Sequence, residues 1–398
     1  MQISAHRFSF ISAALSLIVT YVTSAIPIPL YGVYQTQDHI SYLELSLSSV
    51  VYFIGAVTAL VFFGRLSNFL GRKTISMLAL LLAAGSTLFF LNLHSATPLI
   101  LGRLSQGLAC GLASTAITSW MVDHSASVRS WITPAVLSCG PMTGLTIGGL
   151  GSGFLYEYVA FPRQIGFILG LILNIICLFL LANSQETMPS KRGIAASIKP
   201  NFSLPPKTRK AYPVAACTFI CTWALGGFFQ AFGPTMAREQ LHSQSAIAAA
   251  FVFASIMAPS SIGASIASKM TSRQAQFIGM LAFTLFVAGV LISLKYGVLS
   301  SFLLASVMAG IAQGLVLTGS IGTMVSSLNP DERANVFSVI YATSYIGAAI
   351  PTLIAGRLSE YFSLLEIASG YGLLALCGSL VVIFAKYRFK NLVEIDKV

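Results

Sequence analysis

Long runs of apolar residues, separated by short polar segments, dominate the chain. A helix needs about 20 mostly apolar residues to cross the hydrocarbon core of a bilayer. Twelve runs meet or approach this requirement: residues 9–31, 43–64, 75–93, 98–121, 131–155, 165–182, 212–233, 245–267, 276–295, 298–325, 336–356 and 365–385. The first run is too long for a signal peptide and lacks a small-residue cleavage site, so we interpret it as a true span. The pattern predicts an all-α membrane protein with twelve transmembrane helices.

Composition supports this interpretation. Hydrophobic residues make up 56% of the 398 residues and charged residues only 9%, whereas a soluble domain carries about 25% charged residues. This excludes a soluble enzyme, a disordered chain and a disulfide-rich secreted module. The six cysteines lie inside apolar runs, where they are expected as small core residues. Cys217 and Cys221 share a helix face but have no His or carboxylate nearby, so we expect no metal site and no cofactor.

The basic residues indicate the topology. With the N-terminus in the cytoplasm, eighteen of the 23 Lys and Arg residues fall on the inner side, Arg103 lies within a span, and the outer side has only Arg163, Arg238, Lys295 and Arg357. This is a strong positive-inside bias. We therefore expect both termini in the cytoplasm. We expect the protein itself in a cell membrane of the bacterial inner-membrane type. The net charge of +11 therefore comes from loop residues that set the membrane topology, and it does not indicate binding to nucleic acid.

The longest loop divides the spans six and six. It contains four prolines and six basic residues. We predict an N-terminal six-helix bundle (1–183), a cytoplasmic linker (184–211) and a C-terminal six-helix bundle (212–398). The linker either lies against the anionic inner leaflet or serves as a simple tether.

Short sequences recur at an offset of 203 residues. Gly107–Thr115 in the fourth run matches Gly310–Thr318 in the tenth, and Gly153–Tyr158 matches Gly356–Tyr361. Six spans separate the two copies, so they start from the same side of the membrane. The pattern predicts a parallel repeat, related by an axis along the membrane normal.

Three motifs carry a resemblance to a family. The loop after the second span runs Gly64-Arg-Leu-Ser-Asn68-Phe-Leu-Gly71-Arg72-Lys73, the fourth span has Arg103-Leu-Ser-Gln-Gly107, and the fifth has Gly140-Pro141-Met-Thr-Gly144. They resemble the loop, R-x-x-Q-G and G-P-x-x-G motifs of the major facilitator superfamily, in particular its drug:proton antiporters. The chain departs from the family at Asn68, where Asp is usual, and at Leu145, where a second Gly is common.

The resemblance implies gating residues. They are the loop positions Gly64, Asn68, Gly71, Arg72 and Lys73 and the fifth-span positions Gly140, Pro141 and Gly144. Asp123, at the inner end of the fourth span, stands where the family places a partner for the loop arginine. We predict that an Arg72–Asp123 pair holds the inner mouth shut in one state. The alternative is that these charges serve topology only.

Arg103 is the candidate for proton coupling, a role that the resemblance also implies. A lone cation in a span is costly and is expected to face a cavity or a partner. Snorkelling to the outer headgroups is the alternative. Of the outer carboxylates, Glu44 is the preferred partner over Asp38, and Asp123 is the second candidate for the proton carrier.

An aromatic cavity is expected from the first, seventh and eleventh spans, which the family fold places near the centre. The candidate lining residues are Tyr21, Tyr31, Trp223, Gln230, Tyr341 and Tyr345. No Asp, Glu or Lys lies at mid-depth in any span, which favours a bulky, moderately polar or amphipathic substrate.

Three functions are consistent with these features. The preferred one is a monomeric secondary transporter that exports a small organic molecule in exchange for protons by alternating access. An uptake permease for a metabolite or a siderophore-like compound is the alternative, because fold does not decide function. A membrane enzyme or a sensor is disfavoured, since the chain has no metal motif, nucleophile pair or nucleotide-binding loop.

Overall fold

The computed structural model describes residues 2–129, 132–190, 204–325, 328 and 330–395. Its described residues form helices and no strand. The elements are α1 (Gln2–Ala25), η1 (Ile28–Leu30), α2 (Tyr31–Gln37), α3 (Tyr42–Phe62), α4 (Ser67–Leu70), α5 (Arg72–Leu91), α6 (Ala96–Leu112), η2 (Ala113–Ile117), α7 (Thr118–Asp123), η3 (Ser125–Ser127), α8 (Ile132–Tyr158), α9 (Ile165–Ala182), α11 (Pro206–Arg209), α12 (Tyr212–Glu239), α13 (Ala246–Met257), α14 (Ser260–Ala267), α15 (Ser272–Tyr296), α16 (Leu299–Val325), α17 (Pro330–Leu358) and α18 (Leu364–Ile395).

The predicted fold class is confirmed. Each of the twelve expected spans coincides with a helix or an interrupted helix, and ten helical stretches among the described residues are long and apolar enough to cross a membrane. Three spans are interrupted: α1 ends before Pro27, a π-helical turn (η2) separates α6 from α7, and α13 and α14 are separate helices. Some helices extend beyond their apolar runs, as at α15, where Thr271 and Gln274 form a capping box that starts the helix at Ser272.

The chain divides into two compact units. Of the described residues, unit 1 comprises those within Met1–Asn201, Gln230–Arg238 and Ser243–Ala254, and unit 2 comprises the rest. The division into bundles 1–183 and 212–398 stays a prediction. The inner end of a helix is defined as the end predicted to face the cytoplasm, and the outer end is the opposite one.

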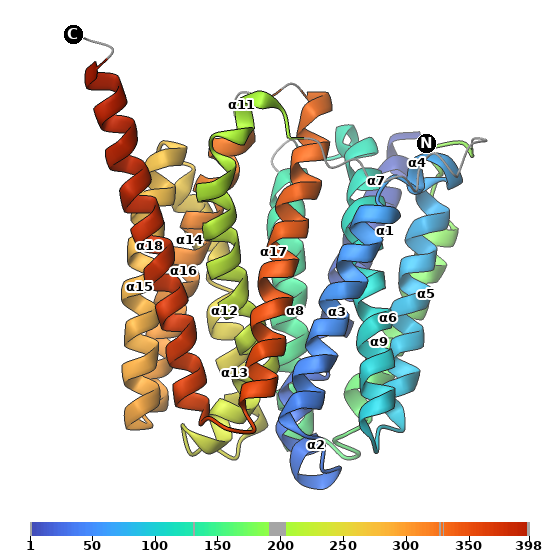
Figure 1. Cartoon of the computed structure of the whole chain (residues 1–398). Helices are drawn as coiled ribbons and strands as arrows, with labels where there is room; N and C mark the ends of the chain where they lie inside the picture. Colours follow the sequence, from blue (N-terminus) through green and yellow to red (C-terminus); the bar gives the residue numbers. More distant parts are fainter. Residues whose placement is uncertain (1, 130–131, 191–203, 326–327, 329, 396–398) are drawn as a thin grey trace. The chain divides into compact units, whose positions relative to one another are not determined.

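Within unit 1, α1 packs against α8, α9 and α6, and α3 and α5 both pack against α6. Figure 1 shows these helices running lengthwise beside one another. Glycine makes the closest approach possible, because a Cβ at Gly107 on α6 would overlap the carbonyl oxygen of Tyr52 on α3. In unit 2, α16 packs against α14 and α15. There a Cβ at Gly310 would lie 2.5 Å from the carbonyl oxygen of Ile256. Gly107 and Gly310 are the repeat-related positions, so the two copies share a packing role.

Candidate functional site

The break in α1 creates the first polar site. Helix α1 ends at Ala25, and the chain continues through the 3₁₀ turn η1. Pro27 has no N–H, so it cannot donate the helical hydrogen bond that the carbonyl oxygen of Thr23 would accept. Carbonyl groups in the last turn of any helix also lack partners within that helix. In a membrane span these oxygens must find other donors.

Side chains from two other helices supply these donors. Gln106 Nε2 donates to the carbonyl oxygen of Thr23 at 2.8 Å, and Arg103 Nη1 donates to that of Ser24 at 2.8 Å. Ser152 Oγ on α8 donates to the carbonyl oxygen of Ile26 at 2.7 Å. The two α6 residues belong to the R-x-x-Q-G motif. The motif therefore caps the broken end of α1.

Arg103 is fully buried, with 0% of its surface exposed. Its Nη1 also donates to Gln106 Oε1 at 2.9 Å, and its guanidinium carbon lies 4.4 Å from the centre of the Tyr52 ring. Its Nε and Nη2 have no hydrogen-bond partner among the described residues. A buried cation with only part of its donors satisfied is energetically costly. The side chain turns toward α1, so the snorkelling alternative is not adopted.

The structure does not bring Arg103 and Glu44 together. The Glu44 carboxylate instead accepts from the N–H and the hydroxyl of Ser41, both at 2.8 Å, while the Ser41 hydroxyl accepts from the Glu44 N–H. This capping box starts helix α3. The expected Arg103–Glu44 pairing is therefore absent because Glu44 is used in capping its own helix.

The predicted lining residues fall into both units. In unit 1, the Tyr21 hydroxyl is 2.6 Å from Ser114 Oγ, and Tyr31 is buried with its hydroxyl 3.4 Å from Ser48 Oγ. Gln230 also belongs to unit 1. In unit 2, the Trp223 and Tyr345 rings pack edge to face with centres 4.8 Å apart, and Tyr341 stacks on Phe337. Their common cavity stays a prediction.

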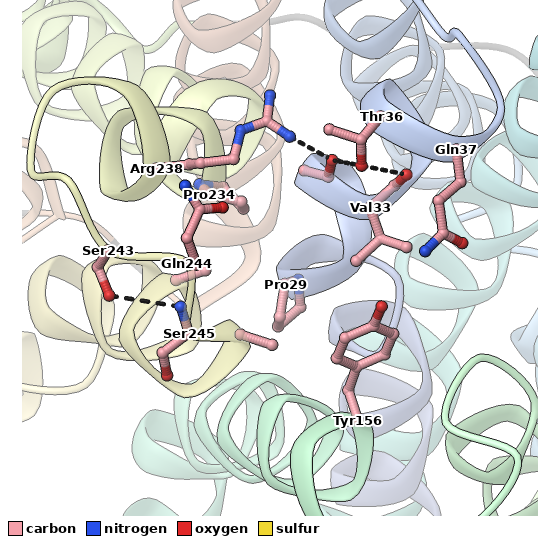
Figure 2. A pocket seen from close by; sticks show the side chains of 13 residues that line it. Pro29, Val33, Thr36, Gln37, Tyr156, Pro234, Arg238, Ser243, Gln244 and Ser245 are labelled. Atoms are coloured by element: carbon pink, nitrogen blue, oxygen red, sulfur yellow. Dashed lines mark hydrogen bonds between the residues drawn. The ribbon is translucent and has the colours of Figure 1, made fainter.

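A cavity of about 170 Å³ lies in unit 1 at the outer end. It is lined by residues of η1, α2, α8, the end of α12, the loop that follows it and the start of α13: Pro29, Gly32, Val33, Thr36, Gln37, Tyr156, Pro234, Arg238, Ser243, Gln244, Ser245, Ala246 and Ala249. Figure 2 shows Arg238 reaching toward α2, where its Nη1 donates to the carbonyl oxygen of Gly32 at 2.6 Å. The sequence-predicted lining residues are not among those that form this cavity.

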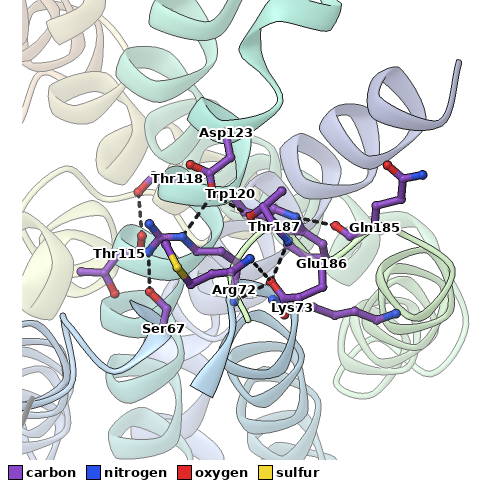
Figure 3. A network of polar contacts seen from close by, with 11 residues as sticks. Ser67, Arg72, Lys73, Thr115, Thr118, Trp120, Asp123, Gln185, Glu186 and Thr187 are labelled. Carbon is purple, nitrogen blue, oxygen red and sulfur yellow. Dashed lines mark hydrogen bonds and ion pairs between the residues drawn. The ribbon is translucent and has the colours of Figure 1, made fainter. Parts of the chain in front are cut away.

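The inner end of unit 1 carries a network of charged and polar groups (Figure 3). Arg72 Nε lies 3.2 Å from Asp123 Oδ2, so the structure brings the two predicted partners together, and their gating role stays a prediction. Arg72 Nη1 also donates to Ser67 Oγ at 2.8 Å, and Thr187 Oγ1 donates to Asp123 Oδ2 at 2.7 Å. Gly71 precedes Arg72 with a φ of 97°, a conformation that favours glycine. The loop motif therefore places Arg72 beside α7.

Glu186 completes this network, and sequence reasoning missed it. Its carboxylate accepts from the N–H groups of Arg72 at 2.9 Å and Lys73 at 3.0 Å, at the N-terminus of α5. Helix N-termini favour negative charge. Lys73 Nζ in return donates to the carbonyl oxygens of Ala182 and Ser184 at the end of α9. An acidic residue directly after the sixth span is the available signal, but Glu186 lies within the predicted linker (184–211).

The other predicted gating residues lie in the turn after α3, on α4 and on α8, and their gating role stays a prediction. Gly64 lies in the turn after α3, and Asn68 lies on the one-turn helix α4. On α8, a Cβ at Gly144 would lie 2.6 Å from the carbonyl oxygen of Ile18 on α1. Gly140 has room for a Cβ, with its nearest neighbour at 3.5 Å. Pro141 lies inside α8, which continues through it.

Two histidines lie beside the network. His6 Nδ1 and His124 Nδ1 are 2.9 Å apart, and the nearby Trp120 donates through Nε1 to the carbonyl oxygen of Gln185 at 3.0 Å. Burial lowers the pKa of His124, and the neighbouring His6 lowers it further. The described residues contain no cluster of three or more His, Cys, Asp or Glu side chains able to hold a metal ion.

Comparisons with known proteins agree with this architecture. One solved structure, a bacterial homologue of the human lysosomal transporter Spinster in an inward-facing, unoccupied conformation, aligns with a TM-score of 0.68 at 13% identity, covering 96% of this chain and 94% of that one. The nucleoside transporter NupG aligns with a TM-score of 0.68 at 14% identity, covering 94% of this chain and 99% of that one. No curated protein matches. Residues 13–352 match the family model of the Major Facilitator Superfamily, and the chain therefore belongs to this family of membrane transporters.

Proposed function

We propose that the protein is a proton-coupled secondary transporter that exports a small, moderately polar or amphipathic organic molecule by alternating access. The observation that carries this proposal is Arg103, a fully buried cation with two donors, Nε and Nη2, unsatisfied among the described residues. Ionisable groups inside a membrane domain are rare, and they mark ion or substrate pathways. We assign proton coupling to this residue.

Arg103 is suited to this role because it links charge to helix geometry. Its Nη1 donates a hydrogen bond to the carbonyl oxygen of Ser24 at the break in α1. A carboxylate or a substrate acceptor that approaches the unsatisfied donors would compete for the guanidinium and change how it holds α1. A proton on that carboxylate would remove the competition. Glu44 and Asp123 stay the proposed proton carriers on the outer and inner sides. In this structure Glu44 caps α3 and Asp123 pairs with Arg72, so each has to leave these partners to take part.

The inner gate is the second part of the proposal. Arg72 and Asp123 have side chains 12% and 29% exposed, so water screens their attraction and the pair contributes only about 0.2–1 kcal/mol. A contact this weak can break and reform during transport. Uptake of a proton by Asp123 would remove its charge and release Arg72.

The substrate class follows from the predicted lining. Aromatic rings at Tyr21, Tyr31, Trp223, Tyr341 and Tyr345, with one amide at Gln230, suit an organic molecule with a large apolar part. The proposal also includes a monomer in a bacterial inner membrane, with both termini in the cytoplasm, as the loop charges predict.

Transport in membrane vesicles of both orientations tests the direction. An exporter that exchanges substrate for protons accumulates a fluorescent amphipathic dye in inside-out vesicles when their lumen is acidic. Right-side-out vesicles with an acidic exterior accumulate none. Accumulation in right-side-out vesicles instead would favour the uptake permease. A thermal-shift screen of the purified protein against drugs, siderophores and sugars identifies candidate substrates for the same assay.

A further inference from the structure

Glu157, in the last turn of α8, makes an unusual contact at the outer end of unit 1. Its Oε1 accepts hydrogen bonds from the Ser245 hydroxyl and, at 3.1 Å, from the Ile247 N–H. Ser245 itself accepts from the Ala248 N–H at 3.1 Å. These groups form the N-terminus of α13, so a carboxylate from a distant part of the sequence caps this helix. Both segments belong to unit 1.

Close packing supports the contact. One turn before Glu157, a Cβ at Gly153 would lie 2.7 Å from the carbonyl oxygen of Ala246, and a Cβ at Gly149 would lie 3.0 Å from the Phe253 ring. The start of α13 therefore rests directly on the glycine face of α8. Ser245, Ala246 and Ala249 also line the outer cavity, with Tyr156 of α8 pointing into it (Figure 2). The Glu157 contact lies beside this cavity.

The charge of Glu157 is balanced by the helix rather than by a basic side chain. Helix α13 carries no titratable residue, and a helix N-terminus favours a nearby anion. The titratable groups on the neighbouring elements are Tyr156 and Tyr158 on α8, Arg238 and Glu239 at the end of α12 and His242 in the loop before α13, together with Arg163 and Asp38 in the outer loops. Arg163 bonds Asp38 at 2.5 Å and Arg238 bonds Gly32. Within the described part of the chain, no Lys or Arg pairs with Glu157.

The repeat provides a natural contrast. Glu360 on unit 2 is the counterpart of Glu157, and Arg357 Nη1 lies 2.6 Å from its carboxylate in the last turn of α17. The residue equivalent to Arg357 in the first copy is Phe154. Glu360 is thus paired within its own segment, whereas Glu157 lacks that partner and bonds α13 instead.

We propose that Glu157 is a proton-controlled latch at the outer end, a role that rests on the proposed proton-coupled transport. As a carboxylate it holds the start of α13 against α8 and keeps the outer cavity closed. A proton taken up from outside converts the carboxylate to a carboxylic acid. This removes the charge that the helix N-terminus favours, so the start of α13 separates from α8 more readily.

The accessibility of a reporter cysteine tests the latch without any substrate. Ala249→Cys places a thiol in the cavity lining, where a membrane-impermeant maleimide added outside reaches it only when the outer end opens. The labelling rate is divided by that of the same variant in denaturant at the same pH, which removes the pH dependence of the thiol itself. The unsubstituted protein gives the background from its own cysteines.

The expected results separate Glu157 from its counterpart. In the reporter background, normalised labelling stays nearly constant between about pH 7.5 and about pH 5.5, and it rises about three- to sevenfold by about pH 3.5, below the ordinary range of a Glu carboxyl. Glu157→Gln labels fast at every pH, and Glu360→Gln behaves like the background. Ser245→Ala, which removes one donor but keeps the carboxylate, raises labelling at neutral pH.

Two outcomes overturn the latch: labelling that stays slow at neutral pH in both Glu157→Gln and Ser245→Ala, or a pH response that persists in Glu157→Gln. If either outcome is found in a protein that still exports substrate in exchange for protons, the latch is wrong and the proposed function is retained. A pH-dependent latch in a protein that does not exchange substrate for protons would support the latch and reject the proposed function.

Discussion

Helices α6 and α16 are the two copies of one repeated element, and they keep the same packing while differing in chemistry. Both carry glycines at equivalent positions that allow close contact with a neighbouring helix. Arg103 and Gln106 on α6, however, correspond to Ser306 and Ala309 on α16. Both α16 residues are buried, and Ser306 Oγ has no hydrogen-bond partner among the described residues.

The neighbouring helices explain this difference. Pro27 and Pro29 interrupt the first span, whereas the equivalent positions in α12 are Gln230 and Phe232, which both have an N–H. Helix α12 runs without interruption from Tyr212 to Glu239. In the first copy, the interruption leaves carbonyl oxygens that need donors from another helix, and the arginine and glutamine of α6 supply them. Helix α12 contains Pro234, which cannot donate to the carbonyl oxygen of Gln230, but the helix continues through this proline. Packing is thus repeated, and the candidate chemistry belongs to one copy.

Glycine substitutions are expected to have the largest effect on stability and to destabilise both copies of the repeat to a similar extent. Gly107→Ala places a Cβ against the backbone of Tyr52, and the repeat-related Gly310→Ala places one against that of Ile256. Neither backbone can move cheaply, so we expect each change to cost about 1–3 kcal/mol and to lower the yield of folded protein. Thermal unfolding of the purified variants measures this.

Two glycines with open space serve as controls for this comparison. Gly85 on α5 and Gly370 on α18 have no atom within 4 Å of an added Cβ. Gly85→Ala and Gly370→Ala should be neutral or stabilise by up to about 1 kcal/mol. If only one of Gly107→Ala and Gly310→Ala destabilises the protein, the shared packing role of the two copies is wrong.

The inner gate is expected to have a smaller effect. Arg72→Ala or Asp123→Ala should shift the population toward the state open to the cytoplasm by at most about 1 kcal/mol, because the pair is partly exposed. Labelling of an inner-side cysteine by an impermeant reagent in inside-out vesicles measures the shift. Arg65→Ala, an exposed cation on the same loop, is the matched control. If labelling is unchanged in both variants, the pair has no gating role and its two charges serve only the membrane topology.

The smallest expected effect is the pH dependence of His124. Burial lowers its pKa in the folded protein, so the folded state binds fewer protons than the unfolded state as the pH falls below the ordinary histidine range. Acid therefore reduces stability. The melting temperature should fall less on acidification in His124→Gln than in the unaltered protein. His94→Gln, with an exposed ring, should retain the full dependence. Equal slopes in all three proteins would contradict this assignment.

The spans and the inner pair could be predicted from the sequence because both leave local signals. Apolar length marks a span, and the loop motif together with an acid at the end of the fourth span indicated Arg72 and Asp123. The capping box at Ser41 and Glu44 was equally readable. Reading it would have shown that Glu44 is already used at the start of α3.

Other parts of the site leave no local signal. Arg103 bonds a backbone carbonyl, which every residue has, so no spacing identifies Ser24 as its partner. Glu186 reaches the start of α5 across 114 residues, and this proximity depends on how α9 packs against α5. Such contacts follow from tertiary packing, which the periodicity of one helix does not specify.

The most direct test of the account is proton-driven transport by Arg103→Ala, measured beside Ser306→Ala in inside-out vesicles. We predict that Arg103→Ala is expressed near normally and has lost dye accumulation driven by an acidic lumen. Ser306→Ala, at the repeat-related position, is predicted to retain it. Full, pH-dependent accumulation by Arg103→Ala would contradict the coupling role and leave Arg103 as a cap for the broken end of α1.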